Sequence, residues 1–359
     1  MRTLVTGGAG FIGSHIAEAL LERGDQVCVI DNLDPRVHGD GIPHFTHEVK
    51  FVHGDIMSPT SLNEALNEEV DVVFHEAAMV GLGRNAADAE SYVSTNIIGT
   101  ARLMDALAKR FNRKPRLILA STMAIYGEGA YKCKVCNESR NGLRDPEDLA
   151  KHDWEPHCNI CRGELEPCSV IEEHHFRPST IYAIAKLNQE LLCMSLGRHF
   201  KIPVVALRYH NVYGPRMPRD TPYAGVASIF KSRLLAGLPP LVYEDGKQLR
   251  DFIHVKDIVQ ANLLVADAPE DGLAFEAFNV GTGQPHEISD FARGLAKALH
   301  SNLEPEFPGL FRLGDVRHIF ASISKIRKLG FTPRVSFEEG VSRFAQESTR
   351  ESPKAAVPP

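Results

Sequence analysis

Residues 3–13, TLVTGGAGFIG, join a short β-strand pattern directly to a loop of regularly spaced glycines. Gly7, Gly10 and Gly13 follow the pattern G-x-x-G-x-x-G, and an apolar helical pattern then runs to Gly24. Glycine lets a backbone turn tightly and approach a pyrophosphate, and the following helix N-terminus offers free N–H groups and a partial positive charge. The stretch therefore predicts a strand–loop–helix unit that binds a dinucleotide.

An acidic residue stands at the distance that such a unit requires. The strand pattern QVCVID ends at Asp31, whose carboxylate is expected to bond the adenosine ribose hydroxyls and to repel a 2′-phosphate. NAD is therefore favoured over NADP. Asp55 follows the third strand pattern and is a candidate to meet the adenine. The alternative for Asp31 is a plain turn residue at the end of a strand.

The chain up to about residue 215 alternates strand-like runs with helical patterns or loops. The runs rich in β-branched residues are TLVTG, QVCVID, KFVHGD, DVVFHEAA and RLILAST, and residues 203–214 are expected to form a sixth strand. This alternation predicts an α/β fold, a Rossmann doubly wound parallel sheet with helices on both faces. Prolines, a helix expected near 224–236 and short strand patterns then indicate a smaller mixed α/β substrate lobe.

The expected organisation has three parts. Residues 1–212 form the NAD-binding Rossmann domain, which carries a Cys-rich insert at 130–176. Residues 213–346 form mainly the substrate-binding lobe, with some segments returning to the Rossmann domain. Residues 347–359 are polar and rich in proline, and are expected to be disordered.

Composition excludes several classes of partner. The 359 residues are 43% apolar and 24% charged, with a formal net charge of −6, which disfavours nucleic acid and anionic membranes. No apolar stretch is long enough to span a bilayer, and the glycines near the N-terminus replace the apolar run of an export signal. The seven cysteines are therefore expected in a reducing cytoplasm, where paired cysteines more often bind metal than form disulfides.

A tyrosine, a lysine and a hydroxyl suggest redox chemistry. Tyr182 and Lys186 share one face of a helix in the stretch IYAIAK, and Ser121 and Thr122 follow the fifth strand pattern. A free tyrosine has a pKa of about 10, and a nearby ammonium and a cationic nicotinamide both favour the phenolate. Such a tyrosine can take a proton from an alcohol while hydride leaves the adjacent carbon. A chance surface pair is the alternative, which the glycine loop disfavours.

Motifs along nearly the whole chain outside the insert carry a resemblance. They are TGGAGFIG, DNL, GD, HEAA, NIIGT, STMAIYG, YAIAK, RYHNVYGP, RDFIHVKD, FNVGTG and RLGD, in that order. The sequence resembles the extended short-chain dehydrogenase/reductase family, in its NAD-dependent nucleotide-sugar epimerase and dehydratase branch. The resemblance implies that Tyr182 is the acid/base, that Thr122 bonds the reacting oxygen, and that Lys186 holds the nicotinamide ribose.

The resemblance also implies the binding residues. Asn96 would support the site, Asn211 would bind the sugar diphosphate, and Arg250 and Arg312 would neutralise it, which suits the guanidinium fork. The implied cofactor-binding positions are Gly7, Gly10, Phe11, Ile12, Gly13, Asp31, Asn32, Asp55, Ile56, Ala77, Ala78, Asn96, Tyr182, Lys186 and Tyr209.

Met123 and Ala124 narrow the reaction. The family's dehydratases carry an Asp–Glu pair there to drive loss of water, and a decarboxylase would also need a carboxylate. With Thr122 and Tyr182 as the remaining proton carriers, we expect oxidation to a 4-keto sugar and return of hydride to the opposite face. The expected activity is therefore an isomerase, an NAD-dependent nucleotide-sugar 4-epimerase.

The sequence is compatible with several related nucleotide sugars as the substrate. DNLDPRVHG, STMAIYGEGAY and the cysteine-bearing segment are similar to enzymes that interconvert dTDP-L-rhamnose and dTDP-6-deoxy-L-talose. The alternatives are a UDP-glucose/UDP-galactose 4-epimerase and a nucleotide-sugar 4-ketoreductase. An alternative of another class is a non-catalytic NAD-sensing scaffold, against which the intact Thr122, Tyr182 and Lys186 argue. The family also implies a homodimer built through the tyrosine helix.

Four cysteines in the insert form CxxC–x21–CxxC: Cys133, Cys136, Cys158 and Cys161. Two such pairs can hold a tetrahedral zinc, and four thiolates leave no open position, so the metal would be structural. The alternative is two turn motifs without metal. Cys168, His157, His174 and His175 are spare candidates, and Cys28 and Cys193 are expected in the core. We expect the insert to cover the sugar site or to add to a subunit contact.

Overall fold

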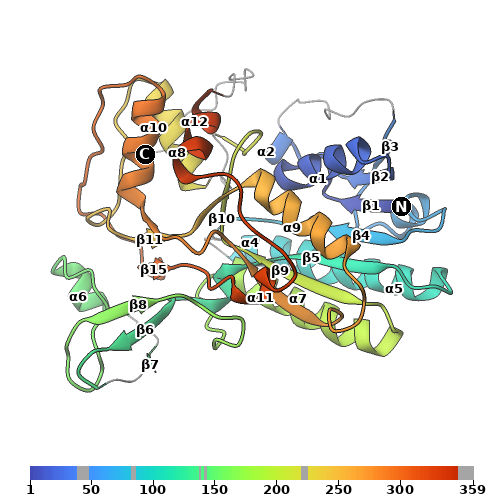
Figure 1. Ribbon diagram of the computed structural model, residues 1–359, viewed down its shortest axis with the longest axis horizontal. Coiled ribbons are helices and arrows are strands. Elements are labelled where there is room, and N and C mark those ends of the chain that lie inside the picture. The colour runs from blue at the N-terminus through green and yellow to red at the C-terminus, as the bar shows by residue number, and fades with distance from the viewer. Residues whose placement is uncertain (39–47, 82–85, 137–138, 141–143, 220–224, 347–359) are drawn as a thin grey trace.

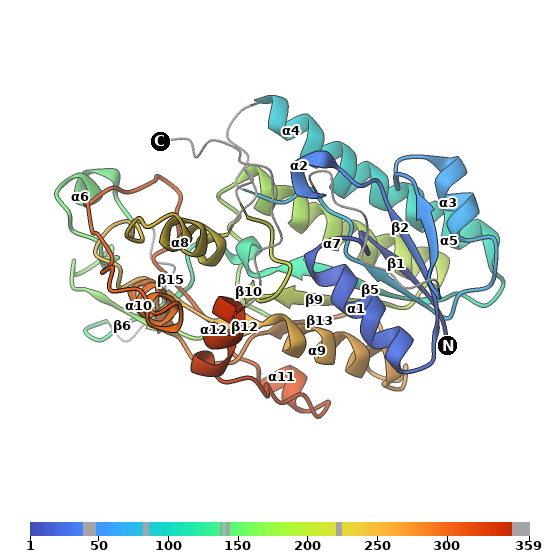
Figure 2. The same cartoon turned by 90° about the horizontal axis from the view of Figure 1, so that it is seen from above.

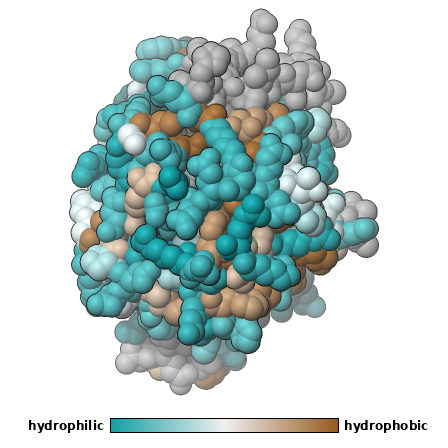
Figure 3. Space-filling model, turned by 90° about the vertical axis from the view of Figure 1, so that its right-hand side faces the viewer, coloured by the Kyte–Doolittle hydropathy of each residue, from teal (hydrophilic) through white to brown (hydrophobic). Residues whose placement is uncertain are grey.

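The computed structural model describes residues 1–38, 48–81, 86–136, 139–140, 144–219 and 225–346. The expected disordered tail, 347–359, lies outside the described residues, as does part of the expected insert. Among the described residues, no helix combines the length and the apolar character that a membrane crossing needs. The end of the molecule drawn in Figure 3 is largely hydrophilic, with apolar side chains visible between the polar ones.

A seven-stranded parallel sheet forms the larger part of the molecule (Figure 1). Its order is β13-β9-β5-β4-β1-β2-β3, so the chain builds outward in one direction from β1 and then in the other from β4. Ligands of such sheets bind at the carboxyl ends of the strands where the direction reverses, here beside β1 and β4. The strands are β1 (Arg2–Thr6), β2 (Gln26–Asp31), β3 (Lys50–His53), β4 (Val72–His75), β5 (Arg116–Thr122), β9 (Val204–Tyr209) and β13 (Glu276–Val280).

Helices cover both faces of the sheet because apolar side chains alternate along buried strands (Figure 2). In β1, Val5 packs with α1 (Phe11–Glu22) and α9 (Val255–Asp267), whereas Leu4 faces the opposite layer. That opposite layer consists of α3 (Pro59–Ala65), α5 (Thr100–Arg110) and α7 (Ile181–Phe200). The sheet loops and connections include α2 (Pro35–His38), α4 (Ala86–Tyr92), η1 (Val93–Gly99), η2 (Met123–Tyr126) and α11 (Ser324–Arg327).

The strand expected at 203–214 is two strands. β9 ends at Tyr209, and His210 breaks the run while its N–H donates to Val280 O. The chain then forms β10 (Asn211–Tyr213), which pairs in parallel with β12 (Phe252–His254) outside the main sheet. The prediction of one continuous strand was wrong because the apolar run does not reveal this change of pairing partner.

The second lobe packs around an aromatic core. Tyr213, Phe252, Phe291 and Phe344 are buried together among α8 (Val226–Leu235), α10 (Ile288–Ala298) and α12 (Phe337–Gln346). The helix expected near 224–236 is therefore confirmed as α8. A small sheet joins β11 (Leu249–Arg250), β14 (His286–Glu287) and β15 (His318–Ile319) at the base of this lobe.

The Cys-rich segment folds as a separate small sheet, at the lower left of Figure 1. Its elements are β6 (Ala130–Cys133), β7 (Ser139–Arg140), α6 (Pro146–Ala150) and β8 (Leu165–Cys168). β6 and β8 are antiparallel, with Cys133 opposite Leu165. Tyr131, Cys133, Cys158 and Leu165 form its small buried core, which contains few apolar side chains for the length of chain.

Candidate active site

The glycine loop lies against the end of β4. Gly7 has φ +67°, and a Cβ there would lie 2.7 Å from the Cα atom of Ala77. A Cβ on Gly13 would lie 2.3 Å from Gly7 O, so the first turn of α1 passes close to the loop. Gly10 precedes α1 without a side-chain cap, while Phe11 and Ile12 form the first helical turn. The loop thus leaves backbone N–H groups at the switch point of the sheet, as a dinucleotide pyrophosphate requires.

Asp31 bonds both the loop and its own turn. One carboxylate oxygen accepts from the N–H of Ala9 at 3.0 Å, and the other accepts from that of Leu33 at 2.9 Å. Nearby, Asn32 donates to Asp55 at 2.9 Å, and Asp55 also accepts from the N–H of Met57. The structure therefore brings Asp31, Asn32 and Asp55 together beside the glycine loop.

Two other expected cofactor positions have different environments. The side chain of Ile56 is 4% exposed and packs in the core between α3 and α5, so it offers no side-chain surface to a ligand. Asn96, in η1, accepts from Met79 N at 2.7 Å and donates to Met79 O at 3.0 Å. Asn96 thus fixes the loop after β4, which contains Ala77 and Ala78.

Thr122 and Tyr182 meet at the end of β5. The Thr122 hydroxyl lies near enough to lower the pKa of Tyr182, but burial, the larger effect, raises that pKa to about 12. Nearby Glu76 raises it further. Thr122 also accepts from Ala124 N at 3.2 Å, which caps η2 and fixes the orientation of the hydroxyl. Tyr182 is therefore neutral in the ligand-free protein.

Lys186 is anchored behind the tyrosine. Its ammonium donates to Ala120 O at 2.5 Å and to the side chain of Gln189, which donates in turn to Thr100 Oγ1 at 2.8 Å. Burial lowers the pKa of Lys186 to about 8, while the charge of Glu76 opposes this shift. The lysine thus bonds the strand end and the helix interior in this structure.

Glu76 is a site residue that sequence reasoning missed. It follows β4 and accepts from Tyr209 OH at 2.9 Å, and Tyr209 accepts from Asn262 at 2.7 Å. Burial raises the pKa of Glu76 to about 7, against smaller lowering effects of Tyr209 and Lys186. A third proton-carrying group therefore lies near Tyr182 and Lys186. Its position at the carboxyl end of a strand, where Asp31 also lies, was the available signal.

A buried ion pair between β9 and α7 also bonds β5, the strand that ends at Thr122. Arg208 on β9 bonds Glu190 on α7 at 2.6 Å, and Glu190 accepts from Ser121 Oγ. Arg208 also donates to Tyr126 OH at 2.8 Å, and Tyr126 donates to Asn279 on β13 at 2.7 Å. One network thus joins five elements, β5, η2, α7, β9 and β13, and α7 carries Tyr182.

The expected diphosphate-binding residues lie near the second lobe and differ in exposure and in hydrogen bonding. Arg250 donates to Leu249 O and Arg317 O, both at 2.9 Å, and to Val316 O. Arg312 is exposed and lies 4.6 Å above the ring of Tyr243. The Oδ1 atom of Asn211 is buried without a hydrogen-bond partner among the described residues. Arg250 is therefore committed to the backbone of 316–317, whereas Arg312 is accessible.

The four expected metal ligands converge. The sulfur atoms of Cys133, Cys136, Cys158 and Cys161 all lie within 4.8 Å of one another, with Cys133–Cys161 at 3.5 Å and Cys136–Cys158 at 3.9 Å. Cys168 lies outside this group, and its sulfur faces Glu166 O. His157 pairs with Asp153 at 2.8 Å, so it also stands apart. Cys193 is buried in the core as expected, and Cys28 packs against the same core cluster.

Comparisons with known proteins agree with this geometry. A sequence profile of the NAD dependent epimerase/dehydratase family matches residues 3–147 and 163–281. The chain belongs to that family. The matched ranges leave out residues 148–162, within the Cys-rich segment. The expected family, the α/β Rossmann fold and dependence on NAD are therefore confirmed.

Individual relatives cover nearly the full chain. A dTDP-L-rhamnose 4-epimerase from Burkholderia thailandensis is 33% identical over 98% of this chain and 97% of its own length. A UDP-N-acetyl-alpha-D-glucosaminuronate decarboxylase from Bacillus cytotoxicus is 31% identical over 96% of this chain and 97% of its own. The UDP-glucose 4-epimerase of Thermus thermophilus, solved with NAD, superposes with a TM-score of 0.75 at 30% identity, covering 96% of this chain and 98% of that one. The expected class, an NAD-dependent epimerase, is thus supported by named relatives.

Proposed function

We propose that this protein is an NAD-dependent nucleotide-sugar 4-epimerase in which Tyr182 is the acid/base. The observation that carries the proposal is the proximity of the Thr122 and Tyr182 hydroxyls at the end of β5, where the chain continues with Met123 and Ala124. Neither of these two side chains can move a proton, so they offer no partner for loss of water or of carbon dioxide. Reversible oxidation of one sugar hydroxyl is the chemistry that the pair supports.

The residues around the glycine loop fit NAD. A Cβ on Gly7 or Gly13 would fill the space beside the loop, and Asp31 stands where a ribose hydroxyl needs an acceptor and a 2′-phosphate would be repelled. Bound NAD supplies the hydride acceptor. Phe11, Ile12 and Gly13 offer backbone N–H groups at the helix N-terminus, while Asp55 and Asn32 lie on the adenosine side. We assign Lys186 to the nicotinamide ribose, since its ammonium lies behind Tyr182 and is held there by Ala120 O and the side chain of Gln189.

Tyr182 removes the proton of the sugar hydroxyl, and Thr122 orients the same oxygen. The phenol must first lose its own proton, which the pKa of about 12 opposes in the ligand-free protein. A charged Glu76 raises that pKa, so the protonated form of Glu76 makes Tyr182 a stronger acid. A neutral Glu76 therefore opposes the phenolate less than a charged Glu76 does. The proton returns from Tyr182 to the same oxygen after the sugar has turned its other face.

We assign the substrate to dTDP-L-rhamnose and its 4-epimer. The support is the similarity to the Burkholderia enzyme of that name and the apolar pair Met123 and Ala124, which suits a 6-deoxy sugar. UDP-glucose is the second candidate, since enzymes of that name share the fold at 30% identity. Arg312 and Asn211 are assigned to the diphosphate, because Arg312 has an accessible guanidinium and Asn211 has a buried acceptor without a partner in the described part of the chain.

One assay tests the activity and the substrate together. The purified protein is incubated with NAD and a panel of dTDP- and UDP-sugars in deuterium oxide, and the products are hydrolysed for sugar analysis. We expect inversion at C4, no net NADH and no deuterium on carbon. Loss of water or carbon dioxide, net reduction, or deuterium on a ring carbon contradicts the proposal.

We also assign a structural zinc to the four cysteines. A tetrahedral zinc with Zn–S bonds of about 2.3 Å places its sulfurs about 3.8 Å apart, close to the 3.5 and 3.9 Å found here. The backbone N–H groups of Cys161 and Ile160 lower the pKa of the Cys158 thiol, and that of Cys136 donates to the sulfur of Cys133 at 3.3 Å. Such donors support thiolate ligands. Zinc quantified by mass spectrometry at about one per chain is the expected result.

A homodimer through α7 is the last part of the proposal. The buried side of α7 includes Lys186 and Cys193, whereas Ile184 and Leu191 on its other side are 48% and 53% exposed. Ile98 on the neighbouring η1 is exposed as well. Exposed apolar residues gathered on adjacent helices are typical of an interface. Leu191→Glu is expected to give a monomer in analytical ultracentrifugation, and an unchanged sedimentation coefficient contradicts the assignment.

A further inference from the structure

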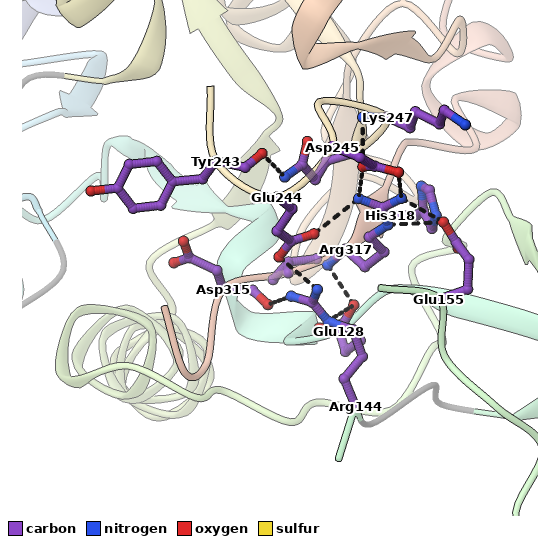
Figure 4. Close-up of polar contacts among 12 residues, drawn as sticks. Glu128, Arg144, Glu155, Tyr243, Glu244, Asp245, Lys247, Asp315, Arg317 and His318 are labelled. Carbon is purple, nitrogen blue, oxygen red and sulfur yellow. Dashed lines mark hydrogen bonds and ion pairs between the residues drawn. The ribbon is translucent and has the colours of Figure 1, made fainter. Parts of the chain in front are cut away.

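The Cys-rich segment contacts the substrate lobe through buried charges rather than through apolar side chains. We call the described residues of 130–168 the cysteine module and residues 312–318 the clamp segment. Figure 4 shows the contacts between them, with Arg317 between the carboxylates of Glu155, Glu244 and Asp245. The clamp segment carries Arg312 and runs into β15, so its position bears directly on the proposed diphosphate site.

Arg317 is the centre of these contacts. Its side chain is 0% exposed and bonds Asp245 at 2.7 Å and Glu244 at 2.9 Å, both in the lobe. From the module, Glu155 accepts from Arg317 Nε at 3.0 Å, and its other oxygen bonds His318 Nε2 at 2.8 Å. Glu155 stands three residues before Cys158, and the intervening Pro156 O accepts from Leu165 N at 3.0 Å. The second cysteine pair therefore sets the place of Glu155.

Arg144 and Tyr131 make a second set of contacts from the module. Arg144 bonds Glu244 at 2.6 Å and donates to Asp315 O. Tyr131, two residues before Cys133, accepts from His318 N at 3.1 Å and donates to Glu128. Glu128 accepts from Arg317 N. Backbone groups at 315, 317 and 318 are thus held from the module side.

The opposite side of the clamp segment meets the proposed active site. Arg250 donates to Val316 O and to Arg317 O, so its guanidinium follows the backbone of the segment. Ser179 donates to Gly314 O at 3.2 Å, next to Thr180, which caps the helix of Tyr182. A turn closes from Asp315 N to Arg312 O at 3.2 Å. The two expected diphosphate arginines and the start of α7 therefore share this segment.

Such a cluster holds its shape only while every charged partner is in place. A buried ion pair is strongly destabilising when one partner is lost, because the other charge stays buried without compensation. The module has few apolar side chains with which to keep Glu155 and Arg144 in place, and small segments of this kind depend on a metal for their fold.

We propose that the four-cysteine metal site positions the clamp segment through Glu155 and Arg144, and so orients Arg312 for the diphosphate of the substrate. This inference rests on the proposed nucleotide-sugar site. Glu155, Arg144 and Tyr131 are positioning residues, since they act through the backbone and the side chain of the clamp segment. The metal thus contributes to substrate affinity from outside the reacting centre.

The test compares Glu155→Gln with Glu166→Gln, a matched change at an exposed acid of the same module. We expect Glu155→Gln to keep zinc and NAD but to raise KM and the Kd for dTDP, measured by calorimetry, about tenfold or more with little change in kcat. Glu166→Gln should match the wild type. Equal affinity in Glu155→Gln with the metal retained overturns the proposal.

A second pair isolates the metal. Cys161→Ser should lose zinc and weaken dTDP binding as much as Glu155→Gln does. Cys168→Ser, which lies outside the cluster, should keep its zinc and its affinity for dTDP. Hydrogen exchange of peptides that cover 312–319 should be faster than in the wild type in Cys161→Ser and in Glu155→Gln. It should be unchanged in the two control variants, Cys168→Ser and Glu166→Gln. If the wild type binds no nucleoside diphosphate, the proposed function fails, and the exchange rates still show whether the metal holds the segment. Unchanged exchange in both variants overturns the coupling.

Discussion

The parallel sheet and the cysteine module are held together by different interactions. In the sheet, alternate residues such as Leu4 and Val5 are fully buried on opposite faces, so apolar packing fixes the strand register. In the module, the small buried core consists of Tyr131, Leu165 and two of the four cysteines, and buried ion pairs make the contact with the lobe. The sheet should therefore stay folded when the module unfolds. Loss of a buried charge or of a cysteine should unfold the module without unfolding the sheet.

Metal removal should separate the two regions most sharply. A strong chelator is expected to unfold the cysteine module, because its thiolates lose the ion that joins both ends of the segment. Four cysteines should become reactive to a thiol reagent, while Cys193 stays protected in the core and NAD still binds. Reactive-thiol counts and NAD titration on the same sample check this. Loss of NAD binding would show that the sheet depends on the module.

Tyr182→Phe should act on the sheet side alone. The substitution removes the hydroxyl near that of Thr122, so kcat is expected to fall by about 10²- to 10⁴-fold, the usual range for a positioned acid/base. NAD content and zinc content should not change, since the substitution removes one oxygen and leaves the glycine loop, Asp31 and the four cysteines in place. Steady-state kinetics with metal and cofactor analysis check this. Turnover within a few-fold of the wild type would remove Tyr182 from the mechanism.

Glu190→Gln tests whether buried charge also matters within the sheet. The Glu190 and Arg208 side chains are 4% and 5% exposed and 2.6 Å apart, so one neutralised partner leaves a buried guanidinium uncompensated. We expect a loss of about 3–5 kcal/mol in the free energy of unfolding. Urea denaturation measures it, with Asp105→Asn as the control, because Asp105 pairs with Lys109 on the surface. Equal midpoints for the two variants would contradict the expected role of this ion pair.

The same contrast explains what the sequence could predict. The glycine loop, the order of the first five strands and the convergence of the cysteines follow from local patterns, because periodicity and short spacings encode them. The contacts of Arg317 with Glu155, Glu244 and Asp245 join parts of the chain far apart in sequence, and no local pattern signals them. Glu76 was missed for a related reason, since its proximity to Tyr182 comes from neighbouring strands rather than from spacing.

The smallest expected effect comes from two buried carboxyls: Glu76, at the end of β4 in the sheet, and Glu128, which accepts a hydrogen bond from Tyr131 of the cysteine module. Burial raises the pKa of both Glu76 and Glu128 from 4.5 to about 7. Between those values the folded protein keeps protons that the unfolded chain releases, so stability is fully present below pH 4.5 and falls as pH rises towards 7. The pKa of Lys186, lowered to about 8, acts in a higher window, where stability rises with pH instead.

Glu76→Gln and Glu128→Gln should each remove part of the decrease in the free energy of unfolding between pH 4.5 and 7. Chemical denaturation of both variants across that range, with NAD absent, measures each share. If the regions are independent, the two losses of slope should add in the double variant, because Glu76 interacts with Tyr209 and Lys186 whereas Glu128 interacts with Arg144 and Arg317. A double variant that departs from this sum would show that the cysteine module and the site at the sheet communicate even without substrate, which places the clamp segment between them as the connecting element.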